Sequence, residues 1–390
     1  MEVDEMENDR ADRERIRVAL IPAMFDLALT YQENVCAEVL HRAGYDVRVF
    51  ASRHGTDPRA SGSREASFPV YRARRVLRFR DTQIPFDCQI VRLIKDFDPH
   101  VALLMAPLHG LGWSWLHVLP ADCRVGSFFS DIPWHREHAP VRMWLKRRMA
   151  QSVFRHSDMV FSATQQTTDL LIEWGGCALR SKLVNLGLTF DPASLRPVAE
   201  LTENVVRLRE SVDKLLVMTT RVTPPKALHV FFTQIEKYLR ENPDDGCVIA
   251  GLGADKAGDL LRDKVRRSLV NDRVVLLPLL NIHQVAALFR FADFSVWNSA
   301  SIGMYHSLAC ACPVVIYRGR GSAELLIRDE VNGIGFDHYE SAGQAMFKAR
   351  NFAWDKGAIL RSVAFADAEK VFPALVGSLY EMRRANPSQD

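Results

Sequence analysis

The sequence has almost no excess of charge of either sign. Its 390 residues include 50 Lys and Arg against 47 Asp and Glu, a formal net charge of +3. A dedicated nucleic-acid-binding protein usually has a strong basic excess, so nucleic acid is excluded as the main partner. Hydrophobic residues make up 48% and charged residues 25%, which excludes disorder of the whole chain. At this length two domains are expected.

Paired cysteines are also missing. The seven cysteines are scattered along the chain and form no CxxC motif. Cys310 and Cys312, the closest pair, are too near in sequence for ordinary zinc-site spacing. We therefore expect no metal site, and buried free thiols in a reducing compartment, with the cytoplasm as the location.

No leader peptide or membrane-spanning segment is recognised. Residues 1–15 have seven acidic and three basic side chains and no apolar core, so we interpret them as a disordered acidic tail. Residues 99–121 contain no Lys, Arg, Asp or Glu over 23 residues, a length that would span a bilayer. Because this segment also contains histidines, prolines and glycines, a buried strand, a loop and a short helix are favoured over a membrane span.

Short apolar segments alternate with helical patterns through the first half of the chain. Residues 16–22 (IRVALIP) read as a buried strand, and residues 33–43 have apolar side chains at helical spacing, ended by Gly44. Further strands are predicted at residues 46–50, 101–105, 124–129 and 159–162. This alternation predicts a doubly wound α/β domain with a parallel sheet.

The same alternation starts again near Lys214, so a second α/β domain is predicted. Its expected strands are residues 215–219, 247–250, 273–277, 294–297 and 313–317. Its expected helices are residues 227–240, a helix ending near 268, 283–291 and 304–310. The domain boundaries predicted in this way are 16–190 for the first domain, 191–213 for a linker, 214–361 for the second domain and 362–390 for a C-terminal helix.

Arg221 and Lys226 lie between a predicted strand and a predicted helix, in the segment TRVTPPKAL. Two cations at the carboxyl end of a strand, beside a helix N-terminus, are suited to gripping a diphosphate. Two solvated loop charges are the alternative interpretation. Gly251 and Gly253 follow the next strand and allow close approach of a ligand, although the dinucleotide motif GxGxxG is incomplete because Lys256 takes its third glycine position.

A third segment with binding potential is Ser301-Ile302-Gly303, which precedes a predicted helix. The first backbone N–H groups of a helix have no acceptor within it and can bind an anion. An ordinary helix start with Ser301 as the N-cap is the alternative.

Several ordered motifs resemble retaining GT-B glycosyltransferases of the group 1 family. Arg221 and Lys226 match the family's G-R-x4-K-G, with Ala227 in place of the last glycine. IAGLG, LFRFADFSV, HSLACACPVV and AELLIRDEVNG, ending at Gly333, match four further motifs in order. The resemblance covers most of the chain after Ile16 and is weaker in the first half.

The resemblance implies a GT-B fold, two Rossmann-like α/β domains facing a central cleft, with the C-terminal helix crossing back to the first domain. It implies sugar transfer from a nucleotide-sugar donor to a hydroxyl acceptor, carbohydrate, lipid-linked or other, without a metal or resident cofactor. Arg221 and Lys226 would be catalytic. The nucleotide-sugar would be bound by Gly251, Gly253, Asn298, Ser301, Ile302, Gly303, His306 and Glu324.

Two departures from the family pattern concern the donor site. The family has E-x7-E, whose carboxylates contact the donor sugar and the ribose, but here the two positions are Asn298 and His306. If neutral His306 binds the ribose, its ordinary pKa of ~6.5 predicts pH-dependent donor binding near neutrality; burial beside Cys310 is the alternative. The family's N-terminal glycine-rich loop is also missing, since residues 23–31 read AMFDLALTY.

On the acceptor side, Asp131 and then His135 are the preferred catalytic candidates, because the family has a His or Asp after the corresponding strand. A turn capped by Asp131 before Pro133 is the alternative. Five arginines within residues 72–80 and the run Lys146-Arg147-Arg148 form basic clusters. Such clusters favour peripheral contact with an anionic membrane, at the inner membrane face, although a solvated helix face fits equally well.

The predicted function is therefore a retaining, metal-independent glycosyltransferase of bacterial polysaccharide, glycolipid or glycoconjugate synthesis. The missing carboxylates leave open a degenerate, non-catalytic scaffold or partner subunit. A sugar-nucleotide epimerase of the same fold is less favoured, because its chemistry needs active-site carboxylates that the sequence does not place.

Overall fold

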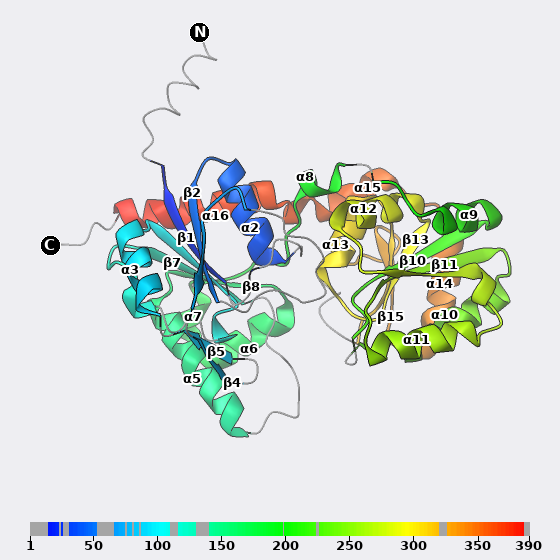
Figure 1. The fold of residues 1–390 in the computed structure, drawn as a ribbon, viewed down its shortest axis with the longest axis horizontal. Helices are drawn as coiled ribbons and strands as arrows, with labels where there is room; N and C mark the ends of the chain where they lie inside the picture. Colours follow the sequence, from blue (N-terminus) through cyan, green and yellow to red (C-terminus); the bar gives the residue numbers. More distant parts are fainter. Residues whose placement is uncertain are drawn as a thin grey trace, which may run out of the picture. The chain divides into compact units, whose positions relative to one another are not determined.

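The computed structural model describes residues 15–22, 25, 31–52, 66–74, 76–79, 82–85, 87–109, 116–129, 140–197, 199–223, 226–319 and 326–385. The chain divides into two compact units, Met1–Leu188 with Ala368–Asp390, and Thr189–Asp367. Figure 1 shows a sheet flanked by helices in each unit. The expected tail of residues 1–15 lies outside the described residues, apart from Arg15.

The first unit is built on a seven-stranded parallel sheet in the order β3-β2-β1-β6-β7-β8-β9. A separate antiparallel hairpin is formed by β4 and β5. The strands are β1 (Arg17–Pro22), β2 (Asp46–Ser52), β3 (Val70–Ala73), β4 (Val76–Phe79), β5 (Thr82–Pro85), β6 (Val101–Met105), β7 (Arg124–Phe129), β8 (Met159–Ser162) and β9 (Leu183–Asn185).

Both faces of this sheet are covered by helices, so its central strands are buried on both sides. In β1, Val18 and Leu20 pack in the core that includes α2 and α16, whereas Ala19 and Ile21 pack in the core that includes α3, α5 and α6. This two-residue alternation explains why the strand reads as a continuous apolar run. The helices are α2 (Gln32–Arg42), α3 (Cys88–Phe97), α5 (Pro140–His156), α6 (Gln165–Gly175), α7 (Cys177–Arg180) and α16 (Ala368–Ala385).

The uncharged segment of residues 99–121 supplies β6 and two short 3-10 turns, Pro107–His109 and Leu116–Val118, in its described part. The predicted strand and short helical structure are therefore present. None of the helices in the described part of the chain is both long and apolar enough to cross a bilayer.

The second unit has a six-stranded sheet, parallel throughout, in the order β12-β11-β10-β13-β14-β15. The chain starts in the middle of the sheet at β10, builds outwards through β11 and β12, and then returns to the other side of β10 with β13. The strands are β10 (Lys214–Thr219), β11 (Asp245–Leu252), β12 (Val274–Pro278), β13 (Phe294–Trp297), β14 (Val314–Tyr317) and β15 (Gly333–Phe336).

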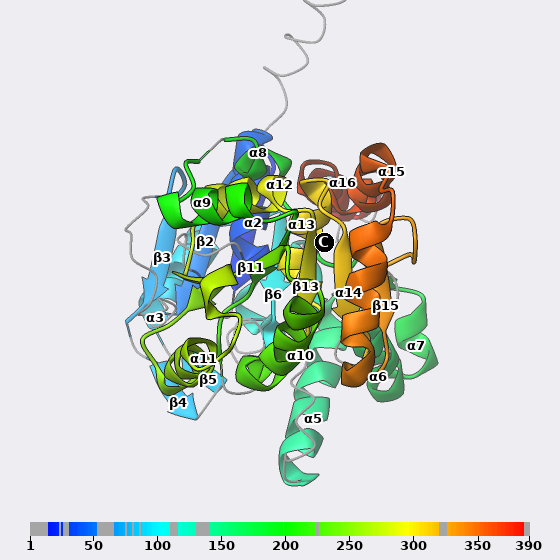
Figure 2. The same cartoon turned by 90° about the vertical axis from the view of Figure 1, so that its right-hand side faces the viewer.

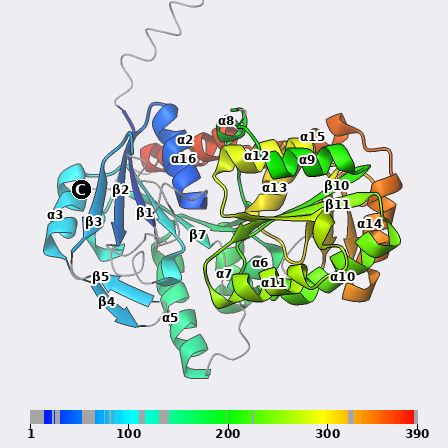
Figure 3. The ribbon, with the colours of Figure 1, turned by 45° about the vertical axis from the view of Figure 1, so that its right-hand side comes forward.

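Helices cover both faces of the second sheet as well, as Figures 2 and 3 show. One core contains residues of α8, α9, α12, α13 and α15, and the other contains residues of α10, α11 and α14. The helices are α8 (Pro192–Leu195), α9 (Glu203–Ser211), α10 (Leu228–Glu241), α11 (Lys256–Arg266), α12 (Ile282–Phe291), α13 (Ile302–Ala309), α14 (Ala342–Asn351) and α15 (Lys356–Val363).

Two predicted boundary segments differ from the observed structure. Residues 191–213, expected to be a linker, form α8 and α9 and belong to the second unit, because Leu195, Val205 and Leu208 are buried in its core. The helix expected from Ser362 is interrupted. It consists of the end of α15, a 3-10 turn at Ala364–Ala366 and then α16, which lies in the first unit.

Candidate functional site

The second sheet changes its direction of growth at β10, and this change defines a place for a ligand. β10 pairs with β11 on one side and with β13 on the other. In open parallel sheets the connections from two such strands run to opposite faces, which leaves a crevice at their carboxyl ends. The loops that follow β10, β11 and β13 are therefore the ones expected to line a ligand site in this unit.

The loop after β10 is held against the end of β11 by backbone hydrogen bonds. The amide of Thr220 donates to Ala250 O at 3.0 Å, and the amide of Val222 donates to Gly251 O at 3.0 Å. Gly251 has φ +110°, and a Cβ at this position would lie 2.1 Å from the Thr220 carbonyl oxygen. Glycine is therefore required at residue 251 for the two loops to approach each other.

Arg221 and Lys226 lie in this loop and are both half-buried. The Lys226 ammonium donates a short hydrogen bond to the Thr220 hydroxyl. Burial, together with the positive charge of Arg221, lowers the pKa of Lys226 from 10.5 to about 8. Two cations that destabilise each other in a partly desolvated loop favour an anion between them, because the anion relieves both effects.

Asn298 follows β13 directly and is 2% exposed. Its side-chain amide Nδ2 donates a 2.6 Å hydrogen bond to the backbone carbonyl of Lys226. The predicted donor-contacting side chain is thus engaged with the cation-bearing loop, and it joins the β13 side of the crevice to the β10 side.

Helix α13 starts at Ile302, beside Asn298 in the sequence. Ser301 occupies its N-cap position in an extended conformation, and its side chain makes no capping hydrogen bond. A Cβ on Gly303 would lie 2.4 Å from Cη2 of Trp297, so glycine allows the first turn to pack on this buried indole. The packing fixes the amides of the first turn, which have no intrahelical acceptor, at the carboxyl edge of the sheet.

His306 is 3% exposed and lies inside α13. Burial lowers its pKa from 6.5 to about 4, so the expected titration near neutrality is wrong for the ligand-free protein. The physical reason is that an imidazolium loses its hydration in the core. His306 is therefore neutral at working pH and offers one donor and one acceptor nitrogen.

Three predicted site residues, Asp131, His135 and Glu324, lie outside the described residues.

Gly253 differs from Gly251, because a Cβ there would approach only the Asp255 side chain, at 3.4 Å or more. The fold therefore does not require glycine at residue 253, although the absence of a side chain there leaves room for a ligand.

Sequence reasoning missed two residues that shape the loop after β11. A Cβ on Gly258 would lie 2.3 Å from the Gly253 carbonyl oxygen, and the guanidinium of Arg262 donates to this same oxygen at 2.8 Å. The helix start at Asp255, whose carboxylate accepts from the Gly258 amide at 3.0 Å, is the local signal that marks this position.

No group of three or more His, Cys, Asp or Glu side chains is arranged to hold a metal ion among the residues that the structure describes. All seven cysteines are free thiols. Five are buried as expected, whereas Cys88 and Cys177 are exposed. The buried thiols are poor nucleophiles, because burial raises the pKa of Cys247, for example, to about 12.

Two family profiles match the chain, one in each unit. Residues 30–187 match a glycosyl transferase 4-like domain, and residues 213–349 match the glycosyl transferases group 1. No curated protein matches the sequence.

Solved structures resemble the chain over almost its whole length. HepE of Anabaena, solved with UDP and glucose, is 13% identical with a TM-score of 0.67, covering 94% of this chain and 100% of its own. A glycosyltransferase of Rickettsia africae is 12% identical with a TM-score of 0.66, covering 97% and 100%. A putative UDP-N-acetylglucosamine 2-epimerase of Listeria monocytogenes is 13% identical with a TM-score of 0.61, covering 94% and 97%. At such low sequence identity, this structural similarity shows a shared fold and nothing more.

Two Rossmann-like domains, each a parallel sheet covered by helices on both faces, define the GT-B class of fold, which confirms the predicted fold class. The two family matches identify the particular group within that class. The chain belongs to the group 1 glycosyltransferases, as its motifs predicted.

Proposed function

We propose that this protein transfers a sugar from a nucleotide-sugar donor to an acceptor hydroxyl, with retention at the anomeric carbon and without a metal ion. The observation that carries the proposal is the pair Arg221 and Lys226 in the loop at the carboxyl end of β10, where the strand order of the sheet reverses. HepE of Anabaena, which shares the fold, has been solved with UDP-glucose. A nucleotide diphosphate is the anion that a pair of cations at this position of an α/β sheet suits best.

The charges at this crevice match the change that occurs in the transfer reaction. When the bond from the anomeric carbon to the diphosphate breaks, negative charge grows on the leaving oxygen. Arg221 and Lys226 stabilise that charge more strongly in the transition state than in the bound donor, which lowers the barrier. They also neutralise the diphosphate, the task that a divalent cation performs in metal-dependent enzymes.

Retention follows from a front-side route. The departing diphosphate oxygen takes the proton of the acceptor hydroxyl on the same face of the sugar on which the new bond forms. Asp131 and, as the second choice, His135 are proposed to be catalytic residues on the acceptor side. Gly251, Gly253, Ser301, Ile302, Gly303, His306 and Glu324 are proposed to line the donor site. His306 would do so as a neutral imidazole.

The test incubates the protein with UDP-, GDP- and ADP-sugars, with and without bacterial acceptor extracts, and measures the released nucleoside diphosphate. We expect acceptor-dependent release with one donor, unchanged turnover in EDTA, and a product of the donor's anomeric configuration by NMR. A product of inverted anomeric configuration would contradict the proposed retention. Loss of turnover in EDTA would contradict the proposed independence from metal ions. No release with any donor and extract would contradict the enzyme assignment.

The acceptor is proposed to be part of bacterial polysaccharide, glycolipid or glycoconjugate synthesis, reached through peripheral contact with a membrane. The support comes from α5, whose sequence PVRMWLKRRMAQSVFRH contains no acidic residue. Trp144 is 57% exposed and Leu145 52% exposed, and the exposed side chains of Arg147 and Arg148 follow them. Exposed aromatic and aliphatic side chains beside arginines suit an anionic bilayer surface.

The structure separates the apolar residues of this helix into two sets. Met149, Val153 and Phe154 are buried in the core, whereas Trp144 and Leu145 are exposed. Co-sedimentation with vesicles of phosphatidylglycerol and phosphatidylcholine tests the contact. We expect binding to vesicles containing phosphatidylglycerol that is lost in the Trp144→Ser/Leu145→Ser variant, whereas Leu269→Ser, another exposed apolar position, retains it. Equal binding of all three proteins would contradict a role for α5.

A non-catalytic partner subunit is the second candidate, because neither position of the family's carboxylate pair carries an acid. Asn298 is engaged with the Lys226 backbone and His306 is neutral. This candidate predicts that the protein binds a nucleoside diphosphate or nucleotide-sugar in calorimetry but releases no product. The epimerase alternative predicts conversion of UDP-N-acetylglucosamine without any acceptor, which the same assay detects.

A further inference from the structure

Asn298 follows β13, where the two halves of the second sheet meet beside β10. Its hydrogen bond to the protein backbone differs from the contact with the donor sugar that the family motif suggests. It is 2% exposed at the end of β13, and its Nδ2 atom lies 2.6 Å from the carbonyl oxygen of Lys226, 72 residues away in sequence. An amide N–H can donate to a carbonyl oxygen, whereas the carboxylate found in the family's motif is an acceptor only.

Among the described residues of the loop between β10 and α10, the backbone hydrogen bonds to neighbouring strands run toward β11. They leave from the amides of Thr220 and Val222 and reach Ala250 and Gly251. At the other end of the loop, the Lys226 amide bonds within the loop, to Thr223 O at 3.0 Å. The contact from Asn298 holds this second end from the β13 side, so the loop is attached across the crevice.

The peptide that Asn298 holds leads into a residue with a strained backbone conformation, Ala227. Its carbonyl belongs to Lys226 and its nitrogen to Ala227, which has φ 46° and ψ 43°, the left-handed region that an L-residue other than glycine adopts only at a cost. Ala227 O then accepts from the Val230 amide at 2.9 Å as α10 begins. A hydrogen bond to this peptide opposes its rotation and thereby keeps the Lys226 side chain directed at Thr220.

We propose that Asn298 is a positioning residue, whose amide fixes the Lys226 backbone so that the ammonium stays beside Thr220 and Arg221 in the partly desolvated crevice. The identity of the ligand in this proposal rests on the proposed function. The contact between Asn298 and the Lys226 carbonyl does not, because it is observed in the structure. It also gives a physical reason for the departure from the family pattern, since an acidic side chain at residue 298 is unable to make this bond.

The first experiment needs no ligand. Protein labelled with 13C at lysine Cε is titrated by NMR, and the Lys226 resonance is assigned from its absence in Lys226→Met. We expect a Lys226 pKa near 8 in the wild type, because the held ammonium is buried beside Arg221. In Asn298→Ala the released loop hydrates the ammonium, so the pKa moves upward toward 10.5. The same pKa in both proteins would overturn the proposal.

The matched control is Asn332→Ala. Asn332 is fully buried in the same unit, and its Nδ2 donates to Leu326 O at 2.8 Å. This variant is expected to lower the melting temperature while leaving the Lys226 resonance and its titration unchanged. A shift of the Lys226 pKa in the control as large as that in Asn298→Ala would show a general effect of destabilisation and would contradict a specific role for Asn298.

The second experiment measures UDP, ADP and GDP affinity by calorimetry at pH 7. Asn298→Ala and Asn298→Asp both lose the hydrogen bond to the Lys226 carbonyl. Each variant is expected to bind the nucleotide that the wild type binds most tightly about tenfold more weakly, the effect of one broken buried hydrogen bond. Unchanged affinity in both would overturn the positioning role. If the wild type binds none of the three while the NMR shift is present, the proposed function fails and the positioning role stands.

Discussion

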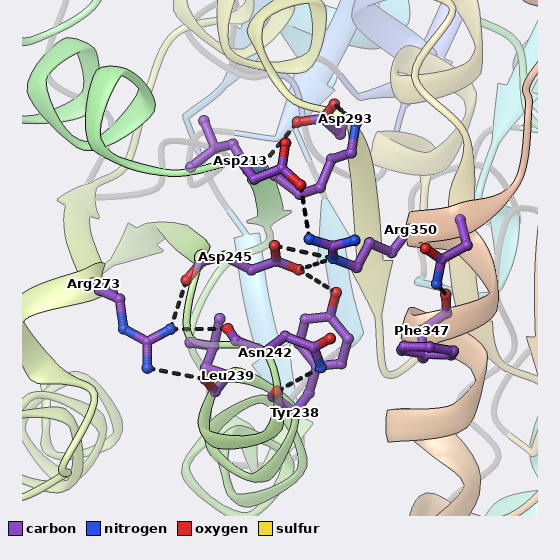
Figure 4. Close-up of polar contacts among 12 residues, drawn as sticks. Asp213, Tyr238, Leu239, Asn242, Asp245, Arg273, Asp293, Phe347 and Arg350 are labelled. Atoms are coloured by element: carbon purple, nitrogen blue, oxygen red, sulfur yellow. Dashed lines mark hydrogen bonds and ion pairs between the residues drawn. The ribbon is translucent and has the colours of Figure 1, made fainter.

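The two edges of the second sheet use charged residues in opposite ways. At the amino edge, Figure 4 shows Asp245 between Arg350 and Tyr238. The Asp245 carboxylate, fully buried, accepts from Arg350 Nε at 3.1 and 3.0 Å and from the Tyr238 hydroxyl at 2.5 Å. At the carboxyl edge, the charge that acts on Lys226 is another cation, Arg221.

The difference shows up in the proton affinities. Pairing with Asp245 raises the pKa of Arg350, and burial with the Asp245 bond raises the pKa of Tyr238, so these groups keep their charge states at any ordinary pH. Lys226, in contrast, loses part of its proton affinity. Opposite charges that satisfy each other stabilise the fold, whereas like charges held together stabilise only a ligand of opposite sign.

Removing a cation from the carboxyl edge is expected to have the largest effect, and on turnover. Arg221→Ala should lower kcat by about a thousandfold, because a donor to the developing charge is lost. Arg266→Ala, at an exposed position of α11, is the matched control and should keep wild-type turnover. Near-normal turnover of Arg221→Ala in the assay of released diphosphate would contradict the proposed site.

Breaking the amino edge should instead affect stability. Arg350→Met leaves the Asp245 carboxylate buried without its cation, which is expected to cost about 3 kcal/mol in the free energy of unfolding. Adding Asp245→Asn removes the buried charge and should restore part of that loss. Urea unfolding measures both variants; equal stability of Arg350→Met and the wild type would show that the ion pair contributes nothing.

The pH dependence of stability distinguishes the two edges further. The folded-state pKa of Lys226 is about 8 against 10.5 when unperturbed, so between these values the unfolded chain binds more protons and stability rises with pH. Lys226→Met is therefore expected to be more stable than the wild type by about 1 kcal/mol at pH 7. The gap should close as pH rises through this window. If Lys226→Met were less stable than the wild type at pH 7, the interpretation that the buried Lys226 ammonium destabilises the fold would be wrong.

The smallest expected effect comes from the left-handed alanine beside Lys226. Ala227→Gly should raise the free energy of unfolding by up to ~1 kcal/mol, because glycine adopts this conformation without a steric cost. Ala311, at φ 59° in the same unit, is the matched comparison, and Ala311→Gly should give a similar gain. Destabilisation by Ala227→Gly in urea unfolding would show that the turn is not strained.

Local sequence patterns were sufficient for the parts of the fold that are buried on both faces. Strands such as β10 and β13 were predicted because a central parallel strand is continuously apolar. β15, with the sequence GIGF, and the short strands β3 and β9 were missed. Their strand character comes from pairing with a neighbour, as Gly333 does with Val314, rather than from their composition.

The sequence by itself determined the fold class, the ordered motifs of the group 1 family and the place of Arg221 and Lys226 between a strand and a helix, because all of these depend on residues close together in the chain. Only the tertiary structure decided the surroundings of Asn298 and His306. One binds a carbonyl 72 residues away, and the other is buried so deeply that its pKa falls to about 4. Desolvation and long-range hydrogen bonds depend on which segments pack together, and no local pattern contains that information.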